Sequence, residues 1–190
     1  TSIRMKKLFS VLFFTLGLGL VYSSCCDGDN PPFFDYTRLQ VATSIIITQP
    51  PTGYTAALSI IPDDISFLAD AARPQLVSAA YGLSCPEPGR EGPKHKITSI
   101  SITADKDFDA NYPAGASLSP LFFYFFGPQK TLTEVDPLFN DFVSPEQGLI
   151  VFSKSLPADT TQSFQLTVRI TKDNGTTAEG VIQSVKFSPQ

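Results

Sequence analysis

The sequence predicts an all-β fold: an antiparallel β-sandwich of immunoglobulin-like type with minor helical turns. Short apolar runs rich in Ile, Val and Phe are separated by turn residues, and the chain contains 16 Phe, 16 Pro and 12 Gly. This composition favours short strands over long helices. Several runs alternate apolar and polar residues, as half-buried strands do. The chain has no Trp, so the Cys–Trp–Cys core of true immunoglobulin domains is missing, which excludes that family but leaves the architecture open.

Six runs are expected to form strands, and one hairpin is the clearest of all. The runs are residues 36–48, 54–61, 75–81, 96–103, 148–153 and 164–171. In the last run, apolar and polar residues alternate from Phe164 to Thr171. It leads through Asp173-Asn174-Gly175 into another strand that contains Val181, Val185 and Phe187. Asn-Gly supplies the positive φ angles that a tight hairpin turn requires.

The pattern between residues 118 and 142 is less regular. The dense apolar run Leu121–Phe126 is too short to span a membrane and is expected in the core; if it were exposed, it would be an interface for another protein. Residues 131–142 could contain a helical turn interrupted by Pro137.

The chain divides into three expected segments. Residues 1–24 are predicted to be a lipoprotein signal peptide with Met5 as the true start, residues 25–35 a lipidated cysteine with an acidic, Pro-rich tether, and residues 36–190 a single β-sandwich domain. Without the first 24 residues, 166 of the 190 remain, enough for one domain with a real core. No internal repeat and no second domain are apparent.

The charge of the chain excludes several partners. Removing Arg4, Lys6 and Lys7 from 14 basic residues leaves 11 against 18 acidic ones, a net charge of −7. An acidic domain without a basic patch is a poor candidate for binding nucleic acid or anionic lipid by electrostatics.

The leader has the organisation of an export signal. Met5-Lys6-Lys7 begins a short positive region, and residues 8–21 are apolar. As a helix this core would measure about 21 Å, against about 30 Å of bilayer hydrocarbon. It is therefore short for a membrane span and suitable for a signal peptide.

Small residues, Ser23 and Ser24, stand directly before Cys25. A small residue before a cysteine, just after an apolar core, resembles the lipobox of bacterial lipoproteins. The resemblance implies that Cys25 is lipidated and that acyl chains anchor the mature protein to a membrane. Tyr22 stands where the lipobox usually has Leu. Lipidation of Cys26, or a plain secretory signal, are the alternatives.

Three cysteines, Cys25, Cys26 and Cys85, are present. If Cys25 is acylated, Cys26 and Cys85 remain as a possible disulfide in an oxidising compartment. That bridge would close a loop of about 60 residues, worth roughly 4 kcal/mol in the chain-entropy model. The alternative is a buried Cys85 and a free Cys26.

The mature region resembles small Bacteroidota lipoproteins of a domain-of-unknown-function family. The matching residues are Cys25-Cys26-Asp27, Ser84-Cys85-Pro86, Ile97–Thr103, Asp107-Phe108, Tyr112-Pro113-Ala114-Gly115 and the final hairpin. Acidic residues directly after the lipidated cysteine also resemble the surface-export signal of such lipoproteins. The resemblance implies an address and a fold, but it supplies no catalytic residue.

One acidic loop is a candidate calcium site. Asp105, Asp107 and Asp109 place carboxylates at alternating positions, and oxygen ligands suit this hard cation. Ala110 and Ala116 occupy the positions where a helix-loop-helix calcium site has Gly and a bidentate Glu, so only another geometry would serve. The alternative is a solvated loop after a strand.

Catalytic constellations are not recognisable in the sequence. His95 is the only histidine and lies in a polar loop, without a Gly-x-Ser-x-Gly motif in the chain. Asp63 and Asp64 are adjacent and would point to different faces of a strand, which is wrong for a glycosidase acid and base. No Gly-rich phosphate loop occurs.

Besides the Leu121–Phe126 run, one more aromatic segment could bind a partner. A separate short motif suggests a modification. Phe33-Phe34-Asp35-Tyr36 lies beside the tether, while the absence of Trp weakens glycan binding. Asp159-Thr160-Thr161 resembles the O-glycosylation sequon of exported Bacteroidota proteins. The tyrosines that keep a glycan platform open are Tyr54, Tyr81, Tyr112 and Tyr124.

Together these observations predict a lipid-anchored lipoprotein of the bacterial cell envelope, at the outer membrane, with exposure at the surface and a periplasmic orientation as the two alternatives. Its domain is expected to be a non-enzymatic protein-interaction module, with a surface glycan or small-ligand binding module as the alternative. The expected partners are the membrane, through the N-terminal lipid, and an envelope protein or glycan. We expect no cofactor and no nucleic acid.

Overall fold

The computed structural model describes residues 31–43, 53–68, 87–124, 130–132 and 148–188. The predicted leader, the three cysteines and the expected strand at 75–81 lie outside these residues. Among the described residues, no helix is long and apolar enough to cross a membrane.

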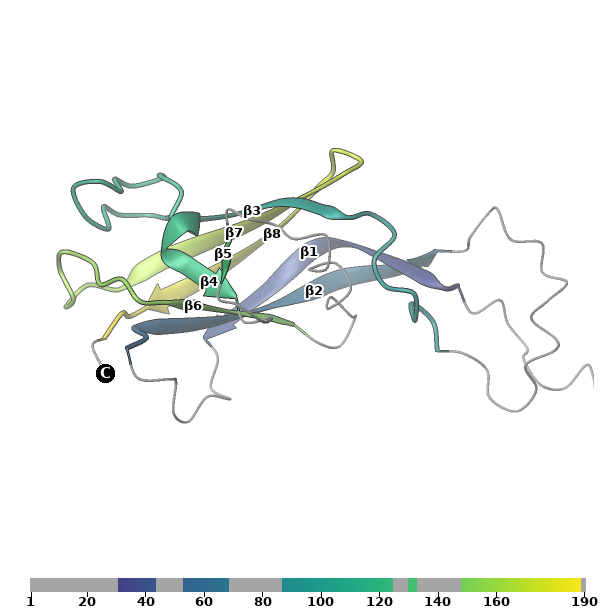
Figure 1. Cartoon of the computed structure of the whole chain (residues 1–190), viewed down its shortest axis with the longest axis horizontal. Helices are drawn as coiled ribbons and strands as arrows, with labels where there is room; N and C mark the ends of the chain where they lie inside the picture. Colours follow the sequence, from purple (N-terminus) through teal and green to yellow (C-terminus); the bar gives the residue numbers. More distant parts are fainter. Residues whose placement is uncertain (1–30, 44–52, 69–86, 125–129, 133–147, 189–190) are drawn as a thin grey trace, which may run out of the picture.

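The described residues form eight strands and one short 3₁₀ turn, which confirms the all-β prediction (Figure 1). The elements are β1 (Phe33–Thr43), β2 (Ala56–Leu68), β3 (Ile97–Ala104), η2 (Ser119–Leu121), β4 (Phe122–Tyr124), β5 (Lys130–Thr131), β6 (Leu149–Ser153), β7 (Phe164–Lys172) and β8 (Thr177–Val185).

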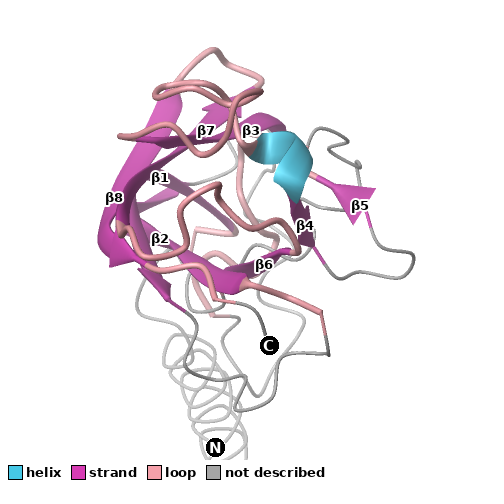
Figure 2. Cartoon of the chain, turned by 90° about the vertical axis from the view of Figure 1, so that its left-hand side faces the viewer, coloured by secondary structure: helices cyan, strands magenta, loops and turns pink. Residues whose placement is uncertain are grey.

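All eight strands belong to one continuous sheet with the order β3-β7-β8-β1-β2-β6-β4-β5. The sheet curls around its own core, so that β3 and β4 approach each other across η2 (Figure 2). Six of its pairings are antiparallel, but β1 and β8 pair in parallel through Arg38 and Glu179. The sheet is therefore mixed, and the prediction of a purely antiparallel arrangement was wrong at this contact, where two strands far apart in sequence meet.

The first strand begins earlier than expected. β1 starts at Phe33, so residues 33–35, which were predicted to belong to the tether, are part of the sheet. The reason is the pairing with β2, which runs from Phe33–Leu68 to Thr43–Leu58 and buries Phe34 completely. β2 also continues through Pro62, because β6 pairs with it only as far as Ile60. Pro62 lies beyond the last of these pairs, so the N–H group that proline lacks is not needed for the ladder between β2 and β6.

The β7–β8 hairpin is confirmed, although its turn differs from the predicted one. The Gly175 N–H donates to the Lys172 carbonyl over 3.0 Å, and the Lys172 N–H donates to the Thr176 carbonyl over 2.9 Å. Within this turn, Gly175 alone has a positive φ, at 81°. Asn174 instead accepts hydrogen bonds from the Thr176 N–H and hydroxyl through its side chain. The connection is thus a three-residue loop with one left-handed Gly.

Gly180 is required where β1 and β8 meet. A Cβ atom at this position would lie 2.3 Å from the Leu39 carbonyl oxygen and 2.8 Å from a methyl group of Val41. Only a residue without a side chain permits this approach of the two backbones.

The segment before η2 covers the free edge of β3. The Leu118 N–H donates to the Ile102 carbonyl over 2.7 Å. The Ser119 hydroxyl accepts from the Ile102 N–H and donates to the Ile100 carbonyl. These contacts satisfy backbone groups that an edge strand would otherwise leave exposed.

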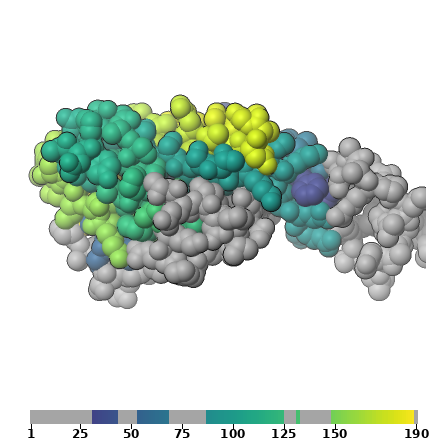
Figure 3. Space-filling model, turned by 45° about the horizontal axis from the view of Figure 1, so that its top comes forward, coloured from purple at the N-terminus to yellow at the C-terminus, as the bar shows by residue number. Residues whose placement is uncertain are grey.

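Different segments of the chain form the two ends of the elongated molecule (Figures 1 and 3). We call residues 105–117 and 154–163, which lie together at one end, the tip. We call the start of β1, the end of β2 and residues 87–94, which lie together at the other end, the base.

Candidate functional site

The two loops of the tip are bonded to each other. The Ala158 N–H donates to the Phe108 carbonyl over 2.8 Å, and the Lys106 ammonium donates to the Ser163 carbonyl over 2.8 Å. Asp105 also accepts from the Gln165 N–H over 2.8 Å. The tip therefore acts as one unit rather than as two independent loops.

Carboxylates shape the first loop of the tip from within. Asp109 accepts from the N–H groups of Asn111, over 2.7 Å, and Tyr112, over 3.1 Å. Asp107 accepts from the Ala114 N–H over 2.7 Å. Such side-chain-to-backbone bonds hold a turn in one conformation.

The same contacts bear on the calcium candidate. Asp105, Asp107 and Asp109 each bond a different stretch of backbone. Across the described ranges, no three acidic, His or Cys side chains form a group that could hold a metal ion. In this structure each of the three carboxylates accepts from a backbone N–H group; the calcium site stays a prediction.

The second loop of the tip is organised by Asp159. Its carboxylate accepts from the N–H and hydroxyl of Thr161 and from the side-chain amide of Gln162. These hydrogen bonds, that of the Thr161 hydroxyl first, lower the pKa of Asp159. Thr160, within the sequon-like motif, is exposed.

Beneath the tip lies a cluster of phenylalanines. Phe108 packs edge-on against Phe187 at 5.1 Å between ring centroids, and Phe164 lies 5.8 Å from Phe108 and 5.7 Å from Phe187. Phe122 joins the cluster through Phe187. All four rings are essentially fully buried. The polar loops of the tip therefore pack over an apolar cluster.

His95 does not lie in the tip. Its Nδ1 atom is 3.3 Å from a carboxylate oxygen of Asp173 in the β7–β8 turn. Asp63 and Asp64 are exposed near the middle of β2. Asp64 accepts from the Thr37 hydroxyl and lies 4.0 Å from the Arg38 Nε atom.

The described tyrosines are mostly internal. Tyr54 and Tyr124 are buried, and Tyr112 is half-buried at the tip, whereas Tyr81 lies outside the described residues. Within the Leu121–Phe126 run, Phe122 and Tyr124 are buried in β4, as the core interpretation expects. The described tyrosines Tyr54, Tyr112 and Tyr124 therefore do not form an open platform of rings for a sugar.

Sequence reasoning missed the most unusual polar group of the core, Lys172. Its ammonium lies 2.5 Å from a carboxylate oxygen of Asp35, donates to the Tyr36 carbonyl and stands 4.1 Å from the centroid of the Tyr36 ring. The side chain of Lys172 is 1% exposed and that of Asp35 20%. A signal existed: the alternation that starts at Phe164 places Lys172 on the inward face of its strand.

The ammonium of Lys172 donates a hydrogen bond to a backbone carbonyl at the edge of β1. The backbones of β8 and β1 pair at Arg38, and Gly92 and Lys94 bond the backbone of Phe34. Between these two contacts, Lys172 binds the Tyr36 carbonyl and Asp35. A buried charge is tolerated when paired in this way, and the contact fastens the first strand to the β7–β8 hairpin.

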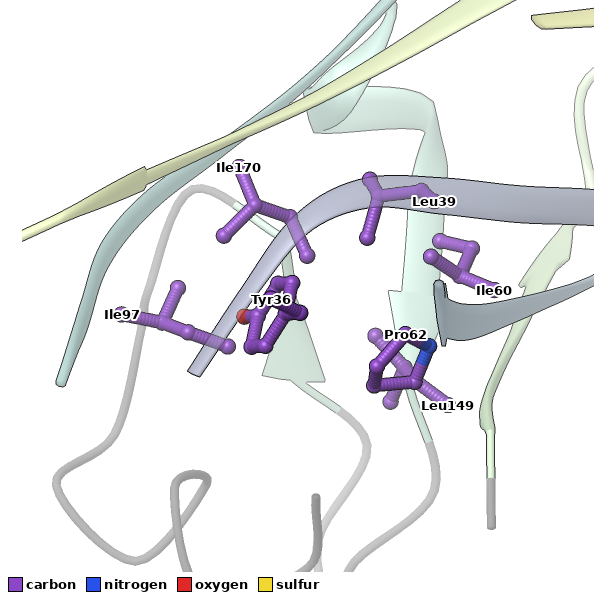
Figure 4. Close-up of a pocket in the computed structure, with 7 residues that line it drawn as sticks. All are labelled: Tyr36, Leu39, Ile60, Pro62, Ile97, Leu149 and Ile170. Carbon is purple, nitrogen blue, oxygen red and sulfur yellow. The ribbon is translucent and has the colours of Figure 1, made fainter. Parts of the chain in front are cut away.

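Beside this ion pair, Tyr36 lines a small apolar cavity of about 10 Å³ with Leu39, Ile60, Pro62, Ile97, Leu149 and Ile170 (Figure 4). The Tyr36 hydroxyl is buried and has no hydrogen-bond partner. Burial first, and the charge of Asp35 second, raise the pKa of Tyr36 above its ordinary value. Six of the seven lining residues are apolar, so the cavity offers a water too few polar partners, and it is too small for an organic ligand.

Cys25, Cys26 and Cys85 lie outside the described residues, so their predicted lipidation and disulfide stay predictions. No family model, curated protein or solved structure matches the chain.

Proposed function

We propose that the curled sheet is an immunoglobulin-like sandwich. Its strand order supports this interpretation, because β3-β7-β8 corresponds to the C-F-G sheet of such domains and β1-β2-β6-β4 to the A-B-E-D sheet. β1 would link the two layers, since it pairs with β2 along its length and with β8 at Arg38. An experimental structure in which these two groups of strands do not face each other would contradict the assignment.

We further propose that the protein is a lipid-anchored lipoprotein of the bacterial cell envelope, at the outer membrane and exposed at the surface, and that its domain is a non-enzymatic protein-interaction module. The leader and Cys25 motivate the address, and the resemblance to Bacteroidota lipoproteins agrees with it. The structural observation that carries the function is the pre-organised tip, two exposed loops fixed by their own carboxylates.

Pre-organisation favours binding because a rigid loop loses little conformational entropy when a partner docks. Loops held by a rigid scaffold are also where binding residues concentrate. The tip lies at the opposite end of the molecule from the start of β1, to which the tether leads (Figure 1). A partner could therefore reach it without approaching the anchoring membrane.

A glycan or small-ligand module is the second candidate, and the structure offers it less support. Tyr54 and Tyr124 are buried, and the cavity beside Tyr36 is too small for a sugar. Of the tyrosines that the structure describes, only the half-buried Tyr112 lies at the tip.

The proposed lipid anchor and the proposed protein partner are tested together. The natively lipidated protein is crosslinked in its own cells and recovered through a tag linked flexibly after Gln190. We expect a reproducible protein partner from the membrane fraction. A Cys25→Ala variant should lose the lipid and appear in the soluble fraction. Flotation of Cys25→Ala with membranes would contradict lipid anchoring, and a point variant that abolishes a hydrolytic activity of the purified protein would contradict the non-enzymatic proposal.

A further inference from the structure

An aromatic side chain is exposed at the base. Phe67 near the end of β2 lies opposite Phe34 of β1. Phe34 is fully buried, whereas Phe67 is 43% exposed. Both rings lie against Gly89, where a Cβ atom would stand 3.0 Å from Phe67 and 3.3 Å from Phe34. The ring of Phe67 therefore rests on a backbone turn and keeps part of its surface open.

The same turn holds the point where the chain enters the fold. The Gly89 N–H donates to the Pro31 carbonyl over 2.8 Å, and the Glu91 N–H donates to the Pro32 carbonyl over 2.8 Å. Phe33 and Leu68, both half-buried, are paired directly after this entry point. Successive side chains of a strand point to opposite faces, so Phe33 and Leu68 lie on one face of this end of the β1–β2 pair and Phe67 lies on the other. We call these three residues, which flank the end of the pair, the base patch.

The tether is too short to carry the base far from a membrane. Pro31 stands six positions after Cys25, and six extended residues span at most about 20 Å. Release of β1 would lengthen this reach. The contacts of Lys172 with Asp35 and Tyr36, together with the bonds of Phe34 to Gly92 and Lys94, oppose it.

We propose that the base patch rests on the headgroup region of the membrane that holds the lipid anchor, with the phospholipid interface as its partner. This inference depends on the proposed lipidation of Cys25. Aromatic and aliphatic side chains partition into this interface. The exposed charges around the patch are mixed, with Arg90 and Lys94 beside Glu87 and Glu91, so binding does not depend on anionic lipid. The tip then points away from the membrane.

The absence of Trp makes a clean test available. A Phe67→Trp variant carries a single fluorescent Trp at the base patch. Matched controls come from the other exposed large apolar residues, Leu156 at the tip, 39% exposed, and Val181 on β8, 44% exposed. Each full-length, lipidated variant is reconstituted into phosphatidylcholine vesicles, with or without bromine on the acyl chains near the headgroup, and flotation is recorded in parallel.

We expect Phe67→Trp to shift its emission to the blue and lose most of its intensity in brominated vesicles, while Leu156→Trp and Val181→Trp keep theirs. Leu68→Trp provides a second reporter of the base patch in case Trp disturbs the contact with Gly89. If the proteins float but both base reporters behave like the controls, docking of the base is wrong and the lipid anchor stands. If the lipidated proteins do not float, the anchor itself is wrong and this inference falls with it.

Discussion

The tip and the base of the same curled sheet are held together by different interactions. Beneath the tip, four buried phenylalanines pack on each other. Toward the base, a buried ammonium joins a carboxylate and a carbonyl, beside a small cavity and an unpaired hydroxyl. The cluster of rings beneath the tip thus gains stability from packing, whereas the contacts of Lys172 toward the base are directional.

This difference follows from the pairing of the strands. Close to the tip, the bonds of Leu118 and Ser119 cover the edge of β3. Toward the base, the backbone pairing of β1 with β8 lies at Arg38 and not at Tyr36. The Tyr36 carbonyl instead accepts a hydrogen bond from the side chain of Lys172. Directional contacts are suited to holding the strand that would bear a pull on the tether.

The largest effect is expected at the packed end. Replacing Phe108 with Ala should lower the free energy of unfolding by about 3–5 kcal/mol, because a fully buried ring leaves a cavity that the neighbouring rings fill only partly. Urea unfolding would measure the loss. Phe67→Ala, at a partly exposed ring of the base, is the control and should cost clearly less. Equal losses for both variants would remove the proposed contrast.

A somewhat smaller effect is expected from Lys172→Ala. Removing one partner of a buried ion pair leaves the other uncompensated, which costs about 3 kcal/mol. The double variant Lys172→Met with Asp35→Asn should recover much of this, because it replaces both charges and keeps the volume. Unfolding of the native protein, Lys172→Met, Asp35→Asn and the double variant completes a double-mutant cycle and gives the coupling energy. If the coupling is close to zero, Lys172 does not hold β1 in the way described.

Tyr36→Phe should be neutral or stabilising by up to about 1 kcal/mol, since it removes a buried hydroxyl without a partner. The native protein should also become less stable as pH rises above the ordinary Tyr pKa of about 10. The pKa of Tyr36 is raised in the folded state, so the unfolded chain loses this proton first and is favoured. The stability difference between Tyr36→Phe and the native protein should therefore grow above that pH. A constant difference would contradict the assignment.

The smallest effect on global stability is expected from Asp159→Ala, at an exposed loop. Its lowered pKa means that the contribution of the carboxylate is present above the ordinary Asp value and is lost as pH falls through the folded-state pKa. Amide exchange at Thr161 should accelerate in the variant at neutral pH, while exchange in β7 stays unchanged. Unchanged exchange at Thr161 would show that Asp159 does not order the loop.

The parts of the fold that could be predicted depend on local pattern. The alternation from Phe164 and the Asn-Gly pair placed the β7–β8 hairpin, and the apolar run around Phe122 placed a core segment. The parallel contact of β1 with β8 could not be predicted, because it joins residues separated by most of the chain. It also depends on the close backbone approach at Gly180, which composition does not reveal.

The candidate site was predicted unevenly for the same reason. The acidic residues of the first loop were singled out from their spacing, but their roles as caps depend on which N–H groups each carboxylate reaches. Lys172 could have been recognised from the inward face of its strand. Its partner Asp35 could not, since 137 positions separate the two residues.

We propose that the tip, and not another surface, binds the partner. A photoreactive residue placed at Ala110 or Thr160 of the tip should capture a protein partner from cells that carry the lipidated chain. The same residue at Gln183, which is exposed on β8, should capture much less. Capture at both tip positions with little at Gln183 is the predicted result. Equal capture at all three positions, or capture at Gln183 alone, would contradict the account.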